Sequence, residues 1–86
     1  MFLSDENKMR VLHVLKKSTA ISDEMLDASN WDKPLTGYYY KLLAIDLVYL
    51  LFELEEEFNI KILYESLENY QFSTINGICE IIQERL

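Results

Sequence analysis

The sequence predicts an all-α fold, and three observations support this prediction. Half of the 86 residues are hydrophobic, and the chain contains only two glycines and one proline. This composition excludes a disordered or low-complexity chain and is not typical of a turn-rich β protein. Apolar residues recur at helical spacing in residues 5–17, 42–58 and 74–86. Since 86 residues suffice for one small domain, we expect a single domain over residues 1–86.

The first predicted helix covers residues 5–17. Ser4 is placed to cap it, and the order of acids in the first turn and lysines in the last turn is the one that the helix dipole favours. His13 falls among the apolar positions in sequence, but we expect it on the surface. The apolar side contains Met9, Val11, Leu12, Val14 and Leu15.

A connection of about twenty residues follows, which is long for so small a domain. We therefore expect that it either has a function or packs tightly against the core. A short amphipathic piece at residues 22–28 lies within it. The expected packing anchors are Ile21, Met25, Leu26, Trp31 and Leu35. The sequence does not decide whether Tyr38, Tyr39 and Tyr40, near its end, are core or surface.

Three further helices are predicted after this connection. The strongest pattern covers residues 42–58, a short helix is expected at residues 64–69, and Thr74 is a plausible N-cap for the last helix. The predicted bundle therefore has three longer helices and a short third one. Its core should contain Leu12, Leu15, Leu47, Leu50, Leu54, Phe58, Ile62, Ile78 and Ile82.

The helix at residues 42–58 has two apolar faces. At 100° per residue, one side carries a wide core stripe, made of Leu43, Leu47, Leu50, Leu51, Leu54 and Phe58. The opposite side carries Ile45, Tyr49, Phe52 and Glu56, with Asp46 and Glu53 beside it. An exposed aromatic patch with an acidic rim is typical of a protein-binding site. The alternative is that the loop containing the three tyrosines buries this second face.

The charge distribution restricts the possible partners. Fifteen acids and eight bases give a net charge of −7, and residues 42–86 contribute nine of those acids and only two bases. Nucleic acid is excluded as a ligand because its phosphates require a basic surface. A basic protein partner is favoured, although acids that merely keep a small apolar domain soluble are the simpler interpretation. No signal peptide or membrane span is visible, and the unpaired cysteine fits a reducing compartment, so we expect a cytoplasmic protein.

Few residues could support catalysis or bind a metal. The chain has one histidine and one cysteine, so neither a metal cluster nor a nucleophile with its base is expected. Glu55, Glu56 and Glu57 point in different directions on a helix and would not converge on one cation. Cys79 is expected to be an inert residue near the core. We therefore predict neither an enzyme nor a metal protein.

Three segments resemble the acyl carrier protein family. The run LEEEFNIKI at residues 54–62 is similar to the end of the second carrier helix. Residues 32–36, with Asp32, Pro34 and Thr36, resemble the loop before that helix, and residues 72–82 resemble the fourth helix and its lead-in. The resemblance implies an acyl-carrier-like bundle. Within that family, the chain resembles most the acyl-carrier-related proteins of bacterial peptide maturation systems, which often lose the attachment serine.

The departure from the carrier pattern affects the chemistry. Carriers attach 4′-phosphopantetheine to a serine at the start of the second helix, and counting back from residues 54–58 places that serine at Ala44 and the aspartate before it at Leu43. Alanine has no hydroxyl to form the phosphate ester, so no phosphopantetheine cofactor is expected.

We therefore predict a non-catalytic interaction module that docks a maturation enzyme or precursor peptide. The predicted partner-binding residues are Ile45, Asp46, Tyr49, Phe52, Glu53 and Glu56. The alternatives are a carrier modified at an atypical site, a small acidic inhibitor or immunity-type protein, and a purely structural domain.

Overall fold

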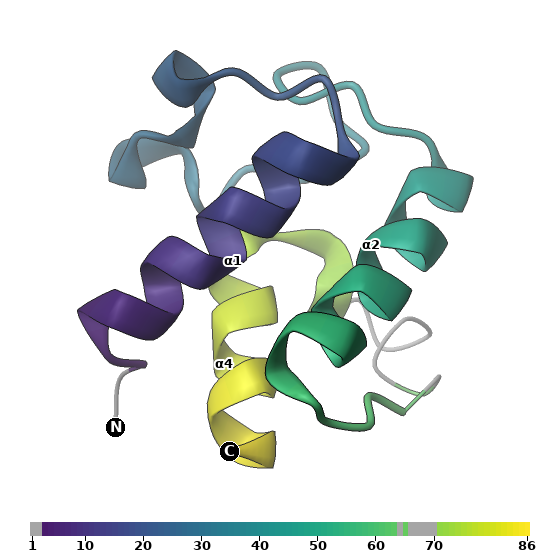
Figure 1. The fold of residues 1–86 in the computed structure, drawn as a ribbon. Coiled ribbons are helices and arrows are strands. Elements are labelled where there is room, and N and C mark those ends of the chain that lie inside the picture. Colours follow the sequence, from purple (N-terminus) through teal and green to yellow (C-terminus); the bar gives the residue numbers. More distant parts are fainter. Residues whose placement is uncertain (1–2, 64, 66–70) are drawn as a thin grey trace.

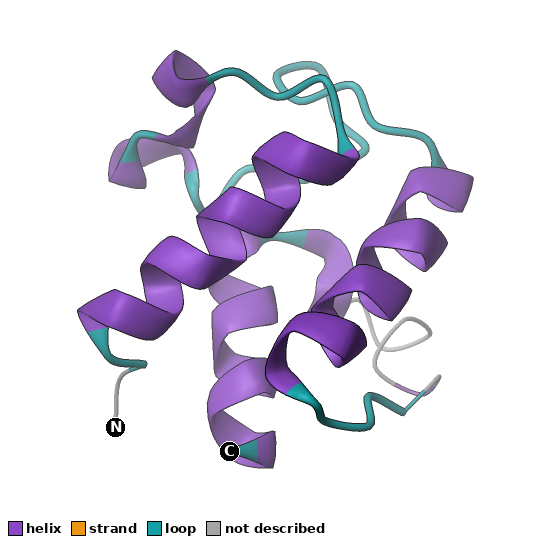
Figure 2. Cartoon of the chain, viewed as in Figure 1, coloured by secondary structure: helices purple, strands orange, loops and turns teal. Residues whose placement is uncertain are grey.

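The computed structural model describes residues 3–63, 65 and 71–86, and these residues form helices and loops without a strand. Three α-helices, α1 (Asp5–Ser18), α2 (Ala44–Phe58) and α4 (Ile75–Arg85), surround one core (Figure 1). The part of the chain that the structure describes also contains three short 3-10 turns, η1 (Asp23–Leu26), η2 (Ala28–Asn30) and η3 (Gln71–Ser73) (Figure 2). The predicted all-α class is confirmed. The short helix predicted at residues 64–69 lies outside the described residues except for Glu65.

The N-terminal ends of α1 and α4 have the predicted capping residues. The Ser4 hydroxyl accepts a hydrogen bond from the Asn7 amide at 3.2 Å, and the Thr74 hydroxyl accepts one from the Gly77 amide at 3.0 Å. Each bond satisfies an amide that has no partner within its own helix. These two caps place the start of each helix where the sequence predicts it.

The start of α2 differs from the prediction by two residues. The helix begins at Ala44, because the Asp46 carboxylate accepts a hydrogen bond from the Leu43 amide at 2.8 Å and so closes the first turn. Leu43 precedes the helix in extended backbone and is 67% exposed. Its placement in the core stripe was therefore wrong, since the helical spacing that assigned it does not apply before the first turn. At the other end, Asn59 stops α2 in the left-handed region, with φ of 54°.

The core matches the predicted set closely. Seven of its nine predicted members are buried: Leu15, Leu50, Leu54, Phe58, Ile62, Ile78 and Ile82. Leu12 and Leu47 are half-buried and pack against this cluster from its edge. Phe72 and Ile75 add large buried side chains from the lead-in and first turn of α4.

An arginine joins the first two helices. The Arg10 Nε atom donates to the Glu57 carboxylate at 2.9 Å, and its Nη2 atom donates to the Glu57 carbonyl oxygen. The same guanidinium lies over the Phe58 ring, 4.2 Å from its centroid. A planar guanidinium can do both at once, so one side chain of α1 fixes the C-terminal end of α2.

The connection between α1 and α2 is held by hydrogen bonds at several points. The Trp31 indole donates to the Leu26 carbonyl at 2.7 Å, and the Leu35 amide donates to the Ser73 carbonyl at 2.7 Å. The Leu42 amide donates to the Leu35 carbonyl at 2.9 Å, which closes the loop at residues 36–41 at its base. The expected anchors are confirmed: Ile21, Leu26 and Leu35 are buried, and Met25 and Trp31 pack against the core.

Candidate functional site

The side of α2 that faces away from the core is apolar and exposed. Ile45 is 52% exposed, Tyr49 61% and Phe52 48%. Glu56 continues the same stripe one turn after Phe52 and is exposed too. We call these four residues the outer face. The loop that contains the three tyrosines does not bury it, so the interpretation that assigned these residues to a second core is wrong.

The three acids predicted around this stripe have different surroundings. Asp46 caps α2 and is half-buried. Glu53 forms an ion pair with Lys17 of α1, with 3.2 Å between Nζ and Oε2. Glu56 has neither an ion pair nor a side-chain hydrogen bond among the described residues. Of the three, Glu56 is therefore the carboxylate most available to a partner.

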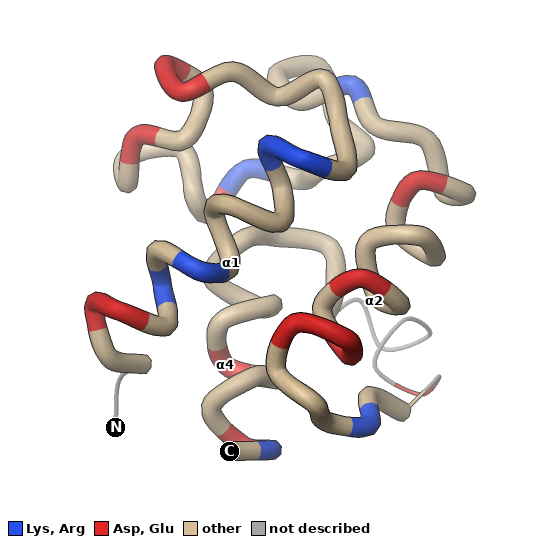
Figure 3. Tube along the Cα trace, viewed as in Figure 1, with Lys and Arg blue, Asp and Glu red and all other residues tan. Residues whose placement is uncertain are grey.

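Every charged residue of α2 is acidic, as Figure 3 shows along the helix. Glu55 and Glu57, which flank Glu56, serve the fold, because Glu55 accepts a hydrogen bond from the Ile62 amide at 2.7 Å and Glu57 binds Arg10. The three adjacent glutamates therefore have separate roles. No group of three metal-ligating side chains comes together among the described residues.

The three consecutive tyrosines of the loop divide between core and surface. Tyr40 is buried, and its hydroxyl lies 2.9 Å from the Met25 carbonyl oxygen and 3.1 Å from that of Asn30. Burial also raises the pKa of the Tyr40 hydroxyl. Tyr39 meets the Tyr40 ring edge to face, and Tyr38 is 98% exposed. One residue of this run is thus an anchor, and another projects fully into solvent.

Two side chains in the segment before α2 are exposed, which was not predicted. Tyr38 and Leu43 line one shallow hollow together with Lys41, just before α2 begins. Tyr38 follows a turn closed by a 3.0 Å hydrogen bond from the Gly37 amide to the Pro34 carbonyl. The Pro-Gly spacing could have indicated a projecting tip, but nothing in the sequence distinguishes Tyr38 from its buried neighbour Tyr40.

Ala44 is the first residue of α2 and is exposed. The position that the carrier pattern assigns to the attachment serine is thus at the helix start and open to solvent. Its side chain is a methyl group, which offers no oxygen to a phosphate. The absence of phosphopantetheine at this position stays a prediction from the sequence.

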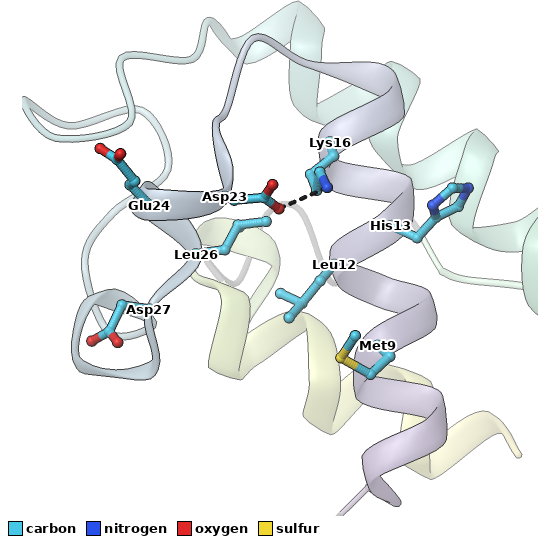
Figure 4. A pocket seen from close by; sticks show the side chains of 8 residues that line it. All are labelled: Met9, Leu12, His13, Lys16, Asp23, Glu24, Leu26 and Asp27. Carbon is cyan, nitrogen blue, oxygen red and sulfur yellow. Dashed lines mark ion pairs between the residues drawn. The ribbon is translucent and has the colours of Figure 1, made fainter.

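Elsewhere, a hollow of about 390 Å³ lies between α1 and η1 (Figure 4). Leu12 and Leu26 form its apolar wall, and the Lys16–Asp23 ion pair, at 2.7 Å, spans one end. His13 is on the surface as predicted and points away from Leu26 in this view. The hollow is open and has neither a buried unpaired polar group nor a cluster of reactive side chains among the residues that line it.

Cys79 is buried in α4, and burial raises the pKa of its thiol. When the pKa of a thiol is raised, a smaller fraction of it is in the reactive thiolate form at neutral pH. This buried environment agrees with the inert role predicted for Cys79 and does not favour a role for its thiol as a nucleophile.

Comparison of the chain with protein-family models, with curated proteins and with solved structures gave no match. Among the described residues, none of the helices has the length and apolar character needed to cross a bilayer. Fold and site together define a small helical protein with an exposed, acid-flanked aromatic surface on one helix. Function is therefore inferred from the chain's own residues.

Proposed function

We propose that the protein is a non-catalytic interaction module that docks a protein partner on the outer face of α2. The supporting observation is that Ile45, Tyr49 and Phe52 are each about half exposed or more, side by side on one helix. Water-exposed aromatic stripes of this kind are uncommon on monomeric proteins unless they bind something. The resemblance to acyl-carrier-related proteins points to a peptide maturation or biosynthetic system.

The chemistry of the partner follows from the charges. The helix that carries the outer face has five acids and no base, and Glu56 is unpaired among the described residues. A partner with an apolar groove and basic residues beside it would bury the rings and pair with Glu56. A maturation enzyme or precursor peptide with such a patch is the proposed occupant.

A binding experiment with matched variants tests this proposal. The protein is immobilised, a partner is captured from the native lysate and identified, and its affinity is then measured for the parent, Tyr49→Ala, Phe52→Ala and His13→Ala. Truncating either aromatic anchor should weaken binding by about 1–2 kcal/mol or more. His13→Ala, which changes an exposed residue of α1, should bind like the parent. Unchanged affinity for both aromatic variants would remove the outer face from the proposal.

The rate of association gives a second readout for the acids. Glu56→Gln should slow association, and added salt should do the same, because exposed charges act mainly by steering the encounter. Glu53→Gln should have a smaller effect, since Lys17 already neutralises that carboxylate. Equal effects of the two variants would contradict the proposed role of Glu56.

We also propose that the chain carries no phosphopantetheine, because Ala44 has no hydroxyl. After incubation with coenzyme A and a phosphopantetheinyl transferase of broad specificity, the intact mass should not change. Ala44→Ser is the companion variant, and we expect weak modification at best because Leu43 replaces the aspartate of the carrier motif. A gain of one phosphopantetheine group on the parent would instead support a carrier modified at an atypical site.

A further inference from the structure

The loop before α2 is a basic segment in an acidic chain. Residues 33–43, which we call the tip loop, contain two lysines and no acid, whereas the rest of the chain contains all fifteen acids and six of the eight bases. Lys33 and Lys41 are both exposed, and neither forms an ion pair among the described residues. Two positive charges at this place are therefore open to a ligand.

Each of these lysines borders an apolar hollow, and Tyr38, which is 98% exposed, is a wall of both hollows. One hollow, of about 390 Å³, lies beside Lys33 and Tyr39, and the other, of similar volume, lies beside Lys41 and Leu43. Both are shallow and open, so neither encloses a small molecule as ligand pockets do. A ligand that fills both hollows has to be long enough to pass Tyr38.

The tip loop has this shape without a ligand. The Tyr39 hydroxyl accepts a hydrogen bond from the Asn30 side-chain amide at 3.0 Å, and the Lys33 ammonium lies 4.1 Å from the centre of the Tyr39 ring. The Lys41 amide donates to the Gly37 carbonyl oxygen at 2.9 Å. A surface that is already ordered loses less conformational entropy on binding, which favours affinity.

We propose that the tip loop binds an extended, acidic peptide segment of a partner protein. The segment passes over Tyr38, places carboxylates beside Lys33 and Lys41, and buries an apolar side chain in each hollow. Charge complementarity determines this chemistry, because a basic segment would meet two like charges in the tip loop and would find no carboxylate there.

A peptide fits this site better than a nucleic acid, although both can be acidic chains. Binding of a nucleic acid requires many phosphates to be neutralised, and the net charge of −7 repels a polyanion. A short peptide has fewer charges and adds apolar side chains that the hollows can cover. The tip loop shares no residue with the outer face, whose acids favour a basic partner, so the two surfaces recognise segments of opposite charge. The tip-loop site therefore does not depend on the docking function proposed above.

Peptide selection tests this site without knowledge of the partner. Short random peptides displayed on phage are selected on the immobilised parent and counter-selected on Tyr38→Ala, which should fold like the parent because Tyr38 is exposed. Circular dichroism checks that fold. The peptides that bind only the parent should be enriched in Asp, Glu and apolar residues relative to the unselected library. When such a peptide is titrated into isotope-labelled protein, the largest amide shift changes should fall within residues 33–43.

Matched variants assign the contacts of a selected peptide. Lys33→Gln and Lys41→Gln should each weaken its affinity by up to about fivefold, which is the range of exposed ion pairs. Added salt should weaken it too. Lys61→Gln removes an exposed lysine outside the tip loop and should bind like the parent. Tyr49→Ala, which changes the outer face, should also bind like the parent.

Several results would overturn the proposed site. One is the selection of neutral or basic peptides, or of none that distinguishes the parent from Tyr38→Ala. Another is an effect of Lys61→Gln as large as those of Lys33→Gln and Lys41→Gln, since net charge alone would then explain the attraction. A short single-stranded DNA that binds the parent and not Tyr38→Ala, where no peptide does, would indicate a nucleic-acid ligand instead. None of these results affects the docking proposal, which fails only when Tyr49→Ala and Phe52→Ala retain partner affinity.

Discussion

The two sides of α2 have nearly the same chemistry and opposite surroundings. Leu50 and Leu54 on the inner side are fully buried, whereas Tyr49 and Phe52, one or two residues away in sequence, are about half exposed or more. Hydrophobicity alone therefore does not decide which side becomes core. The inner side is buried because its leucines pack into the common core and α2 packs against α1, while the outer side ends in Glu56 and is flanked by acids.

The loop before α2 repeats this contrast within three residues. Tyr40 is buried, and Tyr38, two residues earlier, is exposed almost completely. Identical side chains thus serve as an anchor and as a surface group. The difference in exposure indicates which apolar residues stabilise the fold and which are available for contacts with a partner. Substitutions at the two kinds of position test this distinction.

The largest expected effect is on the inner side of α2. Leu54→Ala removes a fully buried side chain and should lower the free energy of unfolding by about 2–5 kcal/mol. Urea denaturation followed by circular dichroism measures the loss. A loss below about 1 kcal/mol would mean that this side is not the packed one.

Tyr40→Phe comes next, because it removes the hydroxyl proton shared between two backbone carbonyl oxygens. We expect a loss of about 1–3 kcal/mol at neutral pH, and Tyr38→Phe, the exposed counterpart, should cost nothing measurable.

The same residue predicts a dependence on alkaline pH. The pKa of Tyr40 is raised above its usual value of 10.0 in the folded protein. Its contribution is therefore complete below pH 10, where the hydroxyl is neutral in both states, and is lost as pH rises through the folded pKa. The difference in stability between the parent and Tyr40→Phe should shrink above pH 10, and a difference that grew there would contradict the assignment.

Arg10→Lys tests the junction of the two helices. Lysine keeps the charge but cannot form the forked contact with Glu57 and lie flat on Phe58 at once. We expect a loss of about 1 kcal/mol in thermal or urea unfolding, since hydrogen bonds to charged groups contribute more than neutral ones. Lys16→Arg, at an exposed ion pair, is the control and should unfold like the parent.

The smallest effect is expected on the outer side. Tyr49→Ala should change the free energy of unfolding by about 0.5 kcal/mol or less, because exposed side chains contribute little packing. The thermal melt of this variant is compared directly with that of Leu50→Ala, its buried neighbour. If both variants melt far below the parent, the two sides of α2 are equally important to the fold, and the contrast drawn above is wrong.

Much of the fold could be predicted from the sequence because its signals are local. The caps at Ser4 and Thr74 and the leucine stripe of α2 each follow from residues a few positions apart. The start of α2 was missed because Asp46 caps the helix from within its first turn, a bond that the apolar pattern does not reveal. Leu43 was misplaced for the same reason.

The candidate site was predictable only in part. Helical spacing placed Ile45, Tyr49 and Phe52 on one stripe, but their exposure depends on where the loop before α2 runs. That path is set by bonds between distant residues, such as the one from the Leu35 amide to the Ser73 carbonyl. The pairing of Glu53 with Lys17, which reduces its availability to a partner, depends on the packing of α1 against α2.

The closed base of the loop at residues 36–41 has a consequence for how the surface can change. Because Leu35 and Leu42 bond to each other through their backbones, the exposed tip of this loop at Tyr38 can be altered or lengthened with little effect on the path of the chain on either side, as long as the buried anchor Tyr40 is kept. Lengthening such a closed segment by a few residues costs only a small additional loop entropy. The tip that carries Tyr38 is thus a position where recognition can diversify, or a label can be inserted, while the helices keep their places.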